Sequence, residues 1–275
     1  MASVNSPIRT LLKPLLFKLF GKNFYAKFQF YAKIKDIDNR LVEEKEMELL
    51  PYFLKKDCNS IDIGANYAYY TISMAQQSKK VFAYEPIPFT HKVCGMLIKH
   101  YNLENIALFL QGVGEFNEIK RFNVPVVDFG GISAGQAHMA ERNNELKGKE
   151  QHYQFNKNEA YDCQVVSLDT AITDNTPISF IKMDIEGAEY FALKGMHHLI
   201  QKHKPVILIE VNPFFLEGFN IKESDLKNFI SASQYKTYTY SKELKKLQAF
   251  EGPYFESNYI LVHEEKIKEF NHIIE

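Results

Sequence analysis

Short apolar runs recur along the chain, and segments with helical periodicity separate them. Several of the runs end at or next to an acidic residue. Apolar runs of this length between turn signals are typical of buried strands, and their alternation with helices is typical of a doubly wound, mostly parallel α/β sheet. We therefore expect strands at 60–63, 80–85, 105–110, 164–168, 178–183 and 206–210, and helices at 41–55, 90–101, 186–204 and 225–230.

The C-terminal part alternates apolar and polar residues instead. Segments 236–240 and 258–262 show this period of two, and we expect them to close the sheet as an antiparallel hairpin. The charged segment 263–275 is expected to form a terminal helix. Earlier in the chain, 116–124 is expected to be an added strand or a hairpin arm.

Residues 125–160 are the least regular part of the chain. They combine Gly130, Gly131 and Gly135 with a polar, charged run. An insertion of this length in a compact domain is usually a functional loop or disordered. We expect 130–135 to be a substrate loop.

Residues 60–71 form a strand, a tight turn and a helix around Gly64. A dinucleotide site needs the pattern G-x-G-x-x-G here, but the three positions hold Gly64, Asn66 and Tyr69. Asp62, at the strand end, would repel phosphate and attract a cation. S-adenosylmethionine (SAM) carries a sulfonium and an ammonium and no phosphate, so it suits this loop better than a dinucleotide. An ordinary turn with a solvated Asp62 is the alternative on this stretch alone.

Glu85 adds to the evidence for a nucleoside site. It ends the second apolar run, 23 residues after Asp62. An acid about 20 residues beyond the first loop hydrogen-bonds ribose hydroxyls in nucleotide-binding α/β folds. Pro86 follows and separates strand from helix. The turn that contains Gly112 and Val113, after the third strand, is expected to lie beside the adenine.

A second set of acids lies where later strands end. Asp184 and Glu210 each follow or end a buried run. If the site transfers a methyl group from SAM to a hydroxyl, it needs a group that accepts the hydroxyl proton, and Asp184, or His138 from the irregular segment, is the predicted general base. In a second scheme, Asp184 and Glu210 hold a Mg²⁺ ion that acidifies the hydroxyl; we prefer the first. Glu186 either takes part in catalysis or caps the following helix.

Composition limits the choice of partners. The chain has 275 residues, 45% of them hydrophobic and 24% charged, which suits one domain plus an extension. Its net charge of −1 gives no support to nucleic acid as the main partner. The three cysteines show neither a C-x-x-C pair nor zinc spacing, which favours reduced thiols in a cytoplasmic protein. No run of eighteen apolar residues is present, so we expect no membrane span.

The first 33 residues contain six basic residues and no acid, with leucines and phenylalanines between them. A basic amphipathic helix binds an anionic membrane surface or packs on protein, either this domain or a second subunit; we expect packing. We assign 1–54 to a helical extension and 55–275 to the catalytic domain, with core motifs at 60–212. Because the extension lies outside the nucleoside motifs, residues 1–33 are expected to be dispensable for cofactor binding.

Four motifs resemble those of the FkbM-type SAM-dependent methyltransferases. They are Asp62-Ile-Gly-Ala-Asn66 with Tyr70-Thr71, Tyr84-Glu-Pro86, Ser167-Leu-Asp169, and Lys182-Met-Asp-Ile-Glu-Gly-Ala-Glu189. The resemblance covers roughly residues 55–215. It implies a seven-stranded class I (Rossmann-like) methyltransferase sheet, SAM as cofactor, and O-methylation of a hydroxyl. The sequence departs from the family pattern at Ala68, where the family usually has glycine.

The resemblance also implies that Asp62, Gly64, Asn66 and Glu85 hold SAM. With their motif neighbours and the turn after the third strand, the candidate cofactor-binding residues are Asp62, Gly64, Asn66, Tyr70, Thr71, Glu85, Pro86, Gly112 and Val113. The candidate catalytic residues are Asp184, Glu210 and His138.

The predicted protein is a cytoplasmic SAM-dependent O-methyltransferase that acts on a hydroxyl of a sugar, glycan or secondary metabolite. A peripheral membrane contact or a homodimer would form through the N-terminal extension. One alternative is a catalytically inactive SAM-fold module for binding or assembly. Another is an RNA methyltransferase, which would need a basic face. The missing glycines disfavour a nicotinamide dehydrogenase.

Overall fold

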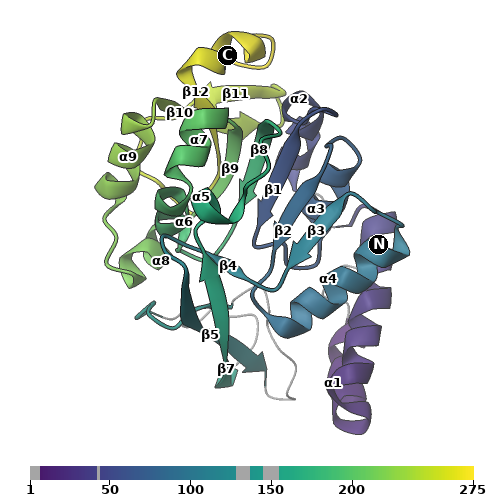
Figure 1. The fold of residues 1–275 in the computed structure, drawn as a ribbon. Coiled ribbons are helices and arrows are strands. Elements are labelled where there is room, and N and C mark those ends of the chain that lie inside the picture. Colours follow the sequence, from purple (N-terminus) through teal and green to yellow (C-terminus); the bar gives the residue numbers. More distant parts are fainter. Residues whose placement is uncertain (1–6, 42–43, 128–136, 145–154) are drawn as a thin grey trace.

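The computed structural model describes residues 7–41, 44–127, 137–144 and 155–275. Its centre is a mixed sheet of eight strands in the order β11-β10-β12-β9-β8-β1-β2-β3, with helices packed on both faces (Figure 1). Five neighbouring strands are parallel: β1 (Asn59–Ile63), β2 (Val81–Tyr84), β3 (Ile106–Phe109), β8 (Ile178–Met183) and β9 (Val206–Val211). Three antiparallel strands form one edge: β10 (Tyr235–Ser241), β11 (Lys246–Ala249) and β12 (Ser257–His263).

This strand order confirms the predicted doubly wound, mostly parallel α/β sheet. The sheet has one strand more than the seven expected, because β11 adds to its edge. β11 has only four residues and a mixed burial pattern, so it carries too little alternation to be recognised in the sequence. β10 and β12 pair antiparallel as expected, and β12 lies between β9 and β10.

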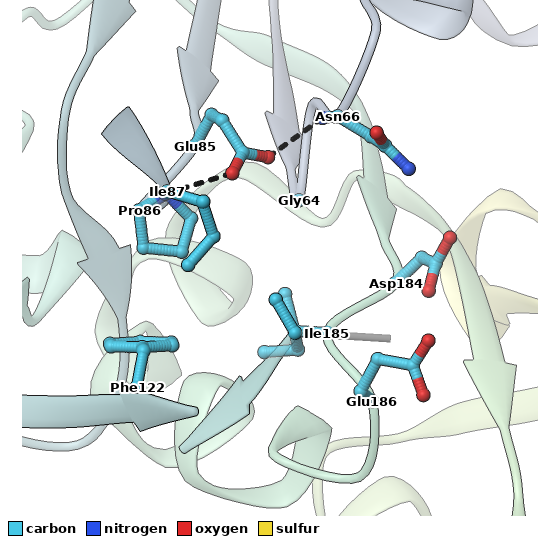
Figure 2. A pocket seen from close by; sticks show the side chains of 10 residues that line it. Gly64, Asn66, Glu85, Pro86, Ile87, Phe122, Asp184, Ile185 and Glu186 are labelled. Carbon is cyan, nitrogen blue, oxygen red and sulfur yellow. Dashed lines mark hydrogen bonds between the residues drawn. The ribbon is translucent and has the colours of Figure 1, made fainter. Parts of the chain in front are cut away.

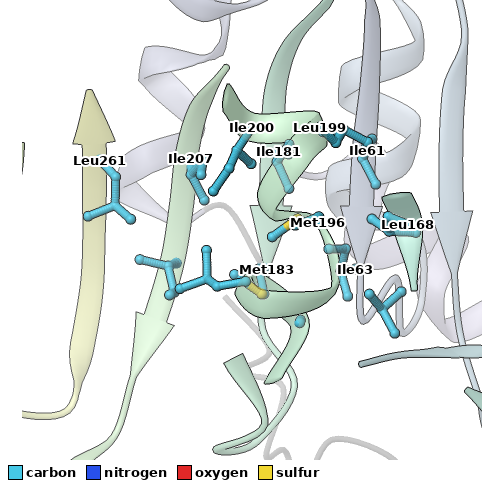
Figure 3. Packing of buried hydrophobic residues seen from close by; sticks show 14 of the residues in the cluster. Ile61, Ile63, Leu168, Ile181, Met183, Met196, Leu199, Ile200, Ile207 and Leu261 are labelled. Atoms are coloured by element: carbon cyan, nitrogen blue, oxygen red, sulfur yellow. The ribbon is translucent and has the colours of Figure 1, made fainter. Parts of the chain in front are cut away.

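Apolar strand residues build the core on both faces of the sheet. Every residue of β1, β2 and β8 is buried, because helices cover the sheet on each side. Figure 3 shows one face, where Ile61, Ile181 and Met183 meet Leu199 and Ile200 of a covering helix. The α-helices around the sheet are α2 (Leu50–Phe53), α3 (Tyr69–Ala75), α4 (Pro88–His100), α5 (Leu168–Ala171), α6 (Glu189–Gly195), α7 (His197–His203), α8 (Pro213–Gly218) and α9 (Glu223–Ala232).

Three predicted helices differ from those observed. The helix expected at 186–204 is two helices, α6 and α7, because Met196 between them leaves helical geometry with φ −128° and ψ 25°. The helix expected at 41–55 is a short 3₁₀ helix, η1 (Lys45–Leu49), followed by α2. The C-terminal segment forms a 3₁₀ helix, η4 (Glu264–Phe270), rather than a long α-helix.

A second sheet of four strands is inserted between β3 and β8 along the chain. Its order is β4-β7-β5-β6, with β4 (Gly112–Val113), β5 (Glu118–Val127), β6 (His138–Met139) and β7 (Phe155–Val166). Figure 1 shows it beyond the end of the large sheet at which β3 leads into β4. Part of the segment expected to be irregular is therefore regular hairpin, and the strand expected at 164–168 begins earlier. The proposed substrate loop at 130–135 lies outside the described residues.

The N-terminal helix α1 (Pro7–Asp38) packs on α4 (Figure 1). Ala26 is buried in a cluster with Ala65 and Ala68 of the loop after β1. The ring of Tyr25 stacks on Phe89 of α4 at 5.7 Å between centroids. The second half of the helix is therefore part of the domain surface around that loop. In the described part of the chain, no helix is long and apolar enough to cross a membrane.

Candidate functional site

The loop after β1 passes close to the residue that follows β8 at Gly64. Gly64 has a φ of +82°, and a β-carbon there would lie 2.0 Å from the carbonyl oxygen of Asp184. Only glycine fits, because any side chain would collide with that backbone and strain its own. The loop continues through Asn66 (φ 47°) and Ala68 (φ 63°), two further left-handed residues. Glycine at position 68 would suit this conformation better than alanine.

Glu85, at the end of β2, ties the same loop to the next helix. Its carboxylate accepts hydrogen bonds from the backbone N–H groups of Asn66 and Ile87, both at 2.9 Å. Burial raises the pKa of Glu85 to about 7, although these two hydrogen bonds favour the charged form. Each carboxylate oxygen keeps a second lone pair for a ligand hydroxyl.

The Gly64 loop, Glu85 and the residues after β8 enclose a cavity of about 60 Å³. In Figure 2, Glu85 lies to one side of Gly64 and the carboxylates of Asp184 and Glu186 to the other. The cavity is lined by Gly64, Asn66, Glu85, Pro86, Ile87, Phe122, Ala137, Asp184, Ile185 and Glu186. A neighbouring cavity of about 20 Å³ shares part of this lining and adds Gln111, Gly112 and Val113.

Three predicted cofactor residues lie behind this lining. Asp62 is 1% exposed, and it accepts a hydrogen bond from the Thr71 hydroxyl at 2.5 Å. The Tyr70 hydroxyl donates to Glu44, just before η1, at 2.9 Å. These side chains do not line the cavity. They fix the loop and its helix from behind, while Gly64, Asn66, Glu85, Pro86, Gly112 and Val113 line one or both cavities.

Asp184 and Glu210 form a paired carboxyl site beside a buried lysine. Lys182 donates to Asp184 at 3.0 Å. Burial alone would raise the pKa of Asp184, but the Lys182 ammonium and a hydrogen bond from Glu210 hold that pKa below its ordinary value. Burial and the Asp184 charge raise the pKa of Glu210, so Glu210 holds the proton. Among the residues that the structure describes, no group of three or more His, Cys, Asp or Glu is arranged to hold a metal ion.

The sequence did not decide whether Glu186 takes part in catalysis or caps a helix. Its neighbour Arg142 was not predicted as a site residue. Burial, then the charge of Asp184, raises the pKa of Glu186 to about 8. The Arg142 guanidinium donates to the Glu186 carbonyl oxygen at 3.1 Å. It also lies 3.0 Å from Nδ1 of His138 on β6. Because arginine only donates, this nitrogen of His138 accepts, and the lone pair that a general base would use is engaged.

A larger cavity of about 410 Å³ lies against the inserted sheet. Phe116, Phe191 and Phe219 give it aromatic walls, with Lys120 and Glu141 among its polar residues. None of the predicted site residues lines it. No motif marks this cavity in the sequence.

Comparison with known families gives one match. A family model described as "Methyltransferase FkbM domain" matches residues 62–245. The match begins at Asp62 and spans the Gly64 loop, the inserted sheet and the Asp184–Glu210 edge. A search of curated proteins found no match.

A search of solved structures found matches at low sequence identity. Methyltransferase FkbM from Methylobacillus flagellatus KT is 18% identical over 87% of this chain and 53% of its own, with a TM-score of 0.48. An rRNA methylase from Streptococcus thermophilus is 11% identical over 81% and 97%, with a TM-score of 0.45. A Streptococcus mutans protein assigned as a methyltransferase, in complex with SAH, is 10% identical over 80% and 97%, with a TM-score of 0.43. The chain thus spans about half of the Methylobacillus protein.

Proposed function

Because the chain belongs to the FkbM methyltransferase family, we propose that it binds SAM and transfers a methyl group to a hydroxyl of a sugar, glycan or secondary metabolite. One observation carries the proposal. The cavity has the Glu85 carboxylate on one side of the Gly64 backbone and the carboxyl groups of Asp184 and Glu186 on the other side. None of its described lining residues is lysine or arginine. These hydrogen-bond acceptors suit the hydroxyls of a ribose and a cation, and they do not suit a phosphate.

The residues present fit SAM part by part. Glu85 has free lone pairs for two ribose hydroxyls. The side-chain oxygen of Asn66 is buried without a hydrogen-bond partner among the described residues, so it is available to an ammonium donor. Gly112 and Val113, in the neighbouring cavity, suit the adenine. The carboxylates of Asp184 and Glu186 then face the charged end of the cofactor and the acceptor.

SAM, when bound, supplies an electrophilic methyl group on a sulfonium. The chain must align the acceptor hydroxyl with it and take the hydroxyl proton. Asp184 is a weak base, because Lys182 and Glu210 engage it and hold its pKa low. Glu186, with a pKa of about 8, is better matched to proton transfer near neutral pH. We therefore assign proton transfer to Glu186 and an electrostatic role, facing the sulfonium, to Asp184.

The first expected result concerns Glu85 and pH. In the free protein Glu85 has a pKa of about 7, and SAM needs its ionised form as acceptor. SAM affinity should therefore fall as pH falls, with a dissociation constant about tenfold higher at pH 6 than at pH 8. Glu85→Gln should cost about 1–3 kcal/mol of SAM binding at pH 8 and flatten the pH dependence. Calorimetry checks both, and an unchanged affinity in a folded variant would exclude Glu85 as the ribose anchor.

The second expected result concerns α1. The contacts of Tyr25 and Ala26 around the Gly64 loop lead us to reverse the expectation that this extension is dispensable. Deleting residues 1–38 should weaken SAM binding by about tenfold, because the loop loses the surface that holds it. Deleting residues 1–20 is the matched control and should leave the affinity unchanged. Equal affinities for the two deletions would contradict a role of α1 in ordering the loop.

Acceptor identity is tested with labelled SAM. Purified protein is incubated with methyl-tritiated SAM and, in separate reactions, methyl glycosides, an extracted glycan pool and a structured RNA. We expect label in a carbohydrate and none in RNA, because carboxylates at the acceptor edge repel a phosphate backbone. Label in RNA alone would replace the hydroxyl-of-sugar proposal with the RNA alternative. SAM binding without transfer to any hydroxyl acceptor, secondary metabolites included, would favour the inactive binding module.

A further inference from the structure

The turn after β8 has a backbone that needs outside support. Glu186 has a φ of +58°, a left-handed conformation that glutamate rarely adopts, and Gly187 follows with a φ of +102°. Non-glycine residues in such conformations persist where the surroundings over-determine them. A β-carbon on Gly187 would lie 2.7 Å from Phe215 of α8, so the turn is packed tightly as well.

Two side chains hydrogen-bond to the backbone of this turn. Glu189, at the start of α6, accepts hydrogen bonds from the N–H groups of Ile185 and Gly187 at 3.1 and 3.2 Å. Arg142 holds the carbonyl between them, since its Nη1 donates to the Glu186 oxygen at 3.1 Å. The N–H groups before and after Glu186 and its own C=O therefore all have a side-chain partner.

Arg142 is itself fixed rather than mobile. Its side chain is 3% exposed, and the guanidinium lies over the Phe215 ring at 4.1 Å. One end of the guanidinium contacts His138 Nδ1, and the other contacts the Glu186 carbonyl and lies 3.6 Å from the Glu186 carboxylate. A planar fork with donors at both ends can make these contacts together, whereas a lysine ammonium cannot.

We propose that Arg142 is a positioning residue that holds the Asp184–Gly187 turn in its strained form and so makes the inserted sheet part of the active site. The assignment rests on the proposed function for its catalytic consequence. The positioning itself is a property of the cofactor-free chain. His138 then serves the site through Arg142, as the acceptor that orients the guanidinium.

Hydrogen exchange on the cofactor-free protein tests the positioning. Arg142→Gln and Arg142→Lys are compared with Arg121→Gln, a matched control on β5 of the same inserted sheet, where Arg121 is 64% exposed and pairs with Asp162. We expect the peptide that covers 184–190 to exchange at least about tenfold faster in both Arg142 variants, with β1 and β2 unchanged. Faster exchange throughout the chain, or an effect equal to that of the control, would overturn the proposal.

A second readout separates positioning from packing. In an Arg142→Ala variant, guanidinium ion at a non-denaturing concentration should enter the vacated space and restore slow exchange of 184–190. In the labelled-SAM assay it should also restore transfer lost by at least about tenfold, with SAM affinity changed less than threefold. If guanidinium does not restore slow exchange of 184–190, the proposal is contradicted. If guanidinium restores slow exchange in the variant but the wild type transfers no methyl group, the positioning role stands and the proposed function is wrong.

Discussion

Glu186→Gln is expected to lower methyl transfer by ~10²–10⁴, the usual contribution of a general base, while SAM affinity changes less than about threefold. Glutamine keeps the size of the side chain and an acceptor oxygen, but it cannot take a proton from the acceptor hydroxyl. In the wild type, turnover should rise with pH through about 8, because Glu186 must lose its proton to act as a base. In the variant this rise should be absent. Initial rates with labelled SAM between pH 6 and 9 measure both effects.

Asp184→Asn is the comparison that decides between the two acids. Removing the Asp184 charge lowers the pKa of Glu210 toward the range in which Glu210 can ionise and partly replace the lost charge, although burial still raises that pKa. We therefore expect a smaller loss of turnover than in Glu186→Gln, and a larger loss when Asp184→Asn is combined with Glu210→Gln. If Asp184→Asn alone removes the pH-dependent limb and Glu186→Gln keeps it, then Asp184 is the base and our assignment fails.

Gly64→Ala is expected to abolish measurable SAM binding and to destabilise the fold. The added carbon would meet the Asp184 carbonyl at 2.0 Å, and alanine would have to adopt a φ of +82°. We estimate the combined loss in unfolding free energy at about 2–5 kcal/mol. The β1 loop and the end of β8 must separate, which displaces the backbone that lines the cavity, so we expect SAM affinity to fall by about 100-fold or more. Chemical denaturation and SAM calorimetry give the two values.

Gly95→Ala is the control for this substitution. Gly95 lies inside α4, where a β-carbon would meet only Leu108 at an ordinary distance of 3.7 Å. Alanine is favoured over glycine in a helix by about 1 kcal/mol, so the variant should be as stable as the wild type or more stable and should bind SAM normally. Similar losses in both variants would point to a general fragility of the fold and not to the close approach at Gly64.

The positions of the strand-end acids could be predicted because parallel strands deliver their carboxyl ends to one edge of a sheet. Glu85 and Asp184 meet around one cavity for this reason, although they are 99 residues apart in the sequence. The same logic could not tell which way each side chain points. Asp62 sits on a strand buried on both faces, so its carboxylate turns to Thr71 behind the cavity lining.

The remaining features depend on contacts that leave no local pattern. Arg142 belongs to a segment without periodicity, and its importance comes from partners 4 and 44 residues away in the chain. Glu186 in a left-handed turn contradicts its own backbone preference, so propensity predicts the wrong geometry there. For α1, the sequence shows a basic segment with leucines and phenylalanines but does not identify the surface on which the helix packs. Membrane contact, dimerisation and cytoplasmic location stay predictions from the sequence.

The central claim is that the cavity between Glu85 and Asp184 binds SAM. Calorimetric titration of the wild-type protein with SAM, and separately with NAD⁺, tests it most directly, with Glu85→Gln titrated alongside. We expect one SAM bound per chain, no heat from NAD⁺, and a clear loss of SAM affinity in the variant. Binding of NAD⁺ in place of SAM, or SAM binding that Glu85→Gln leaves unchanged, would contradict the account.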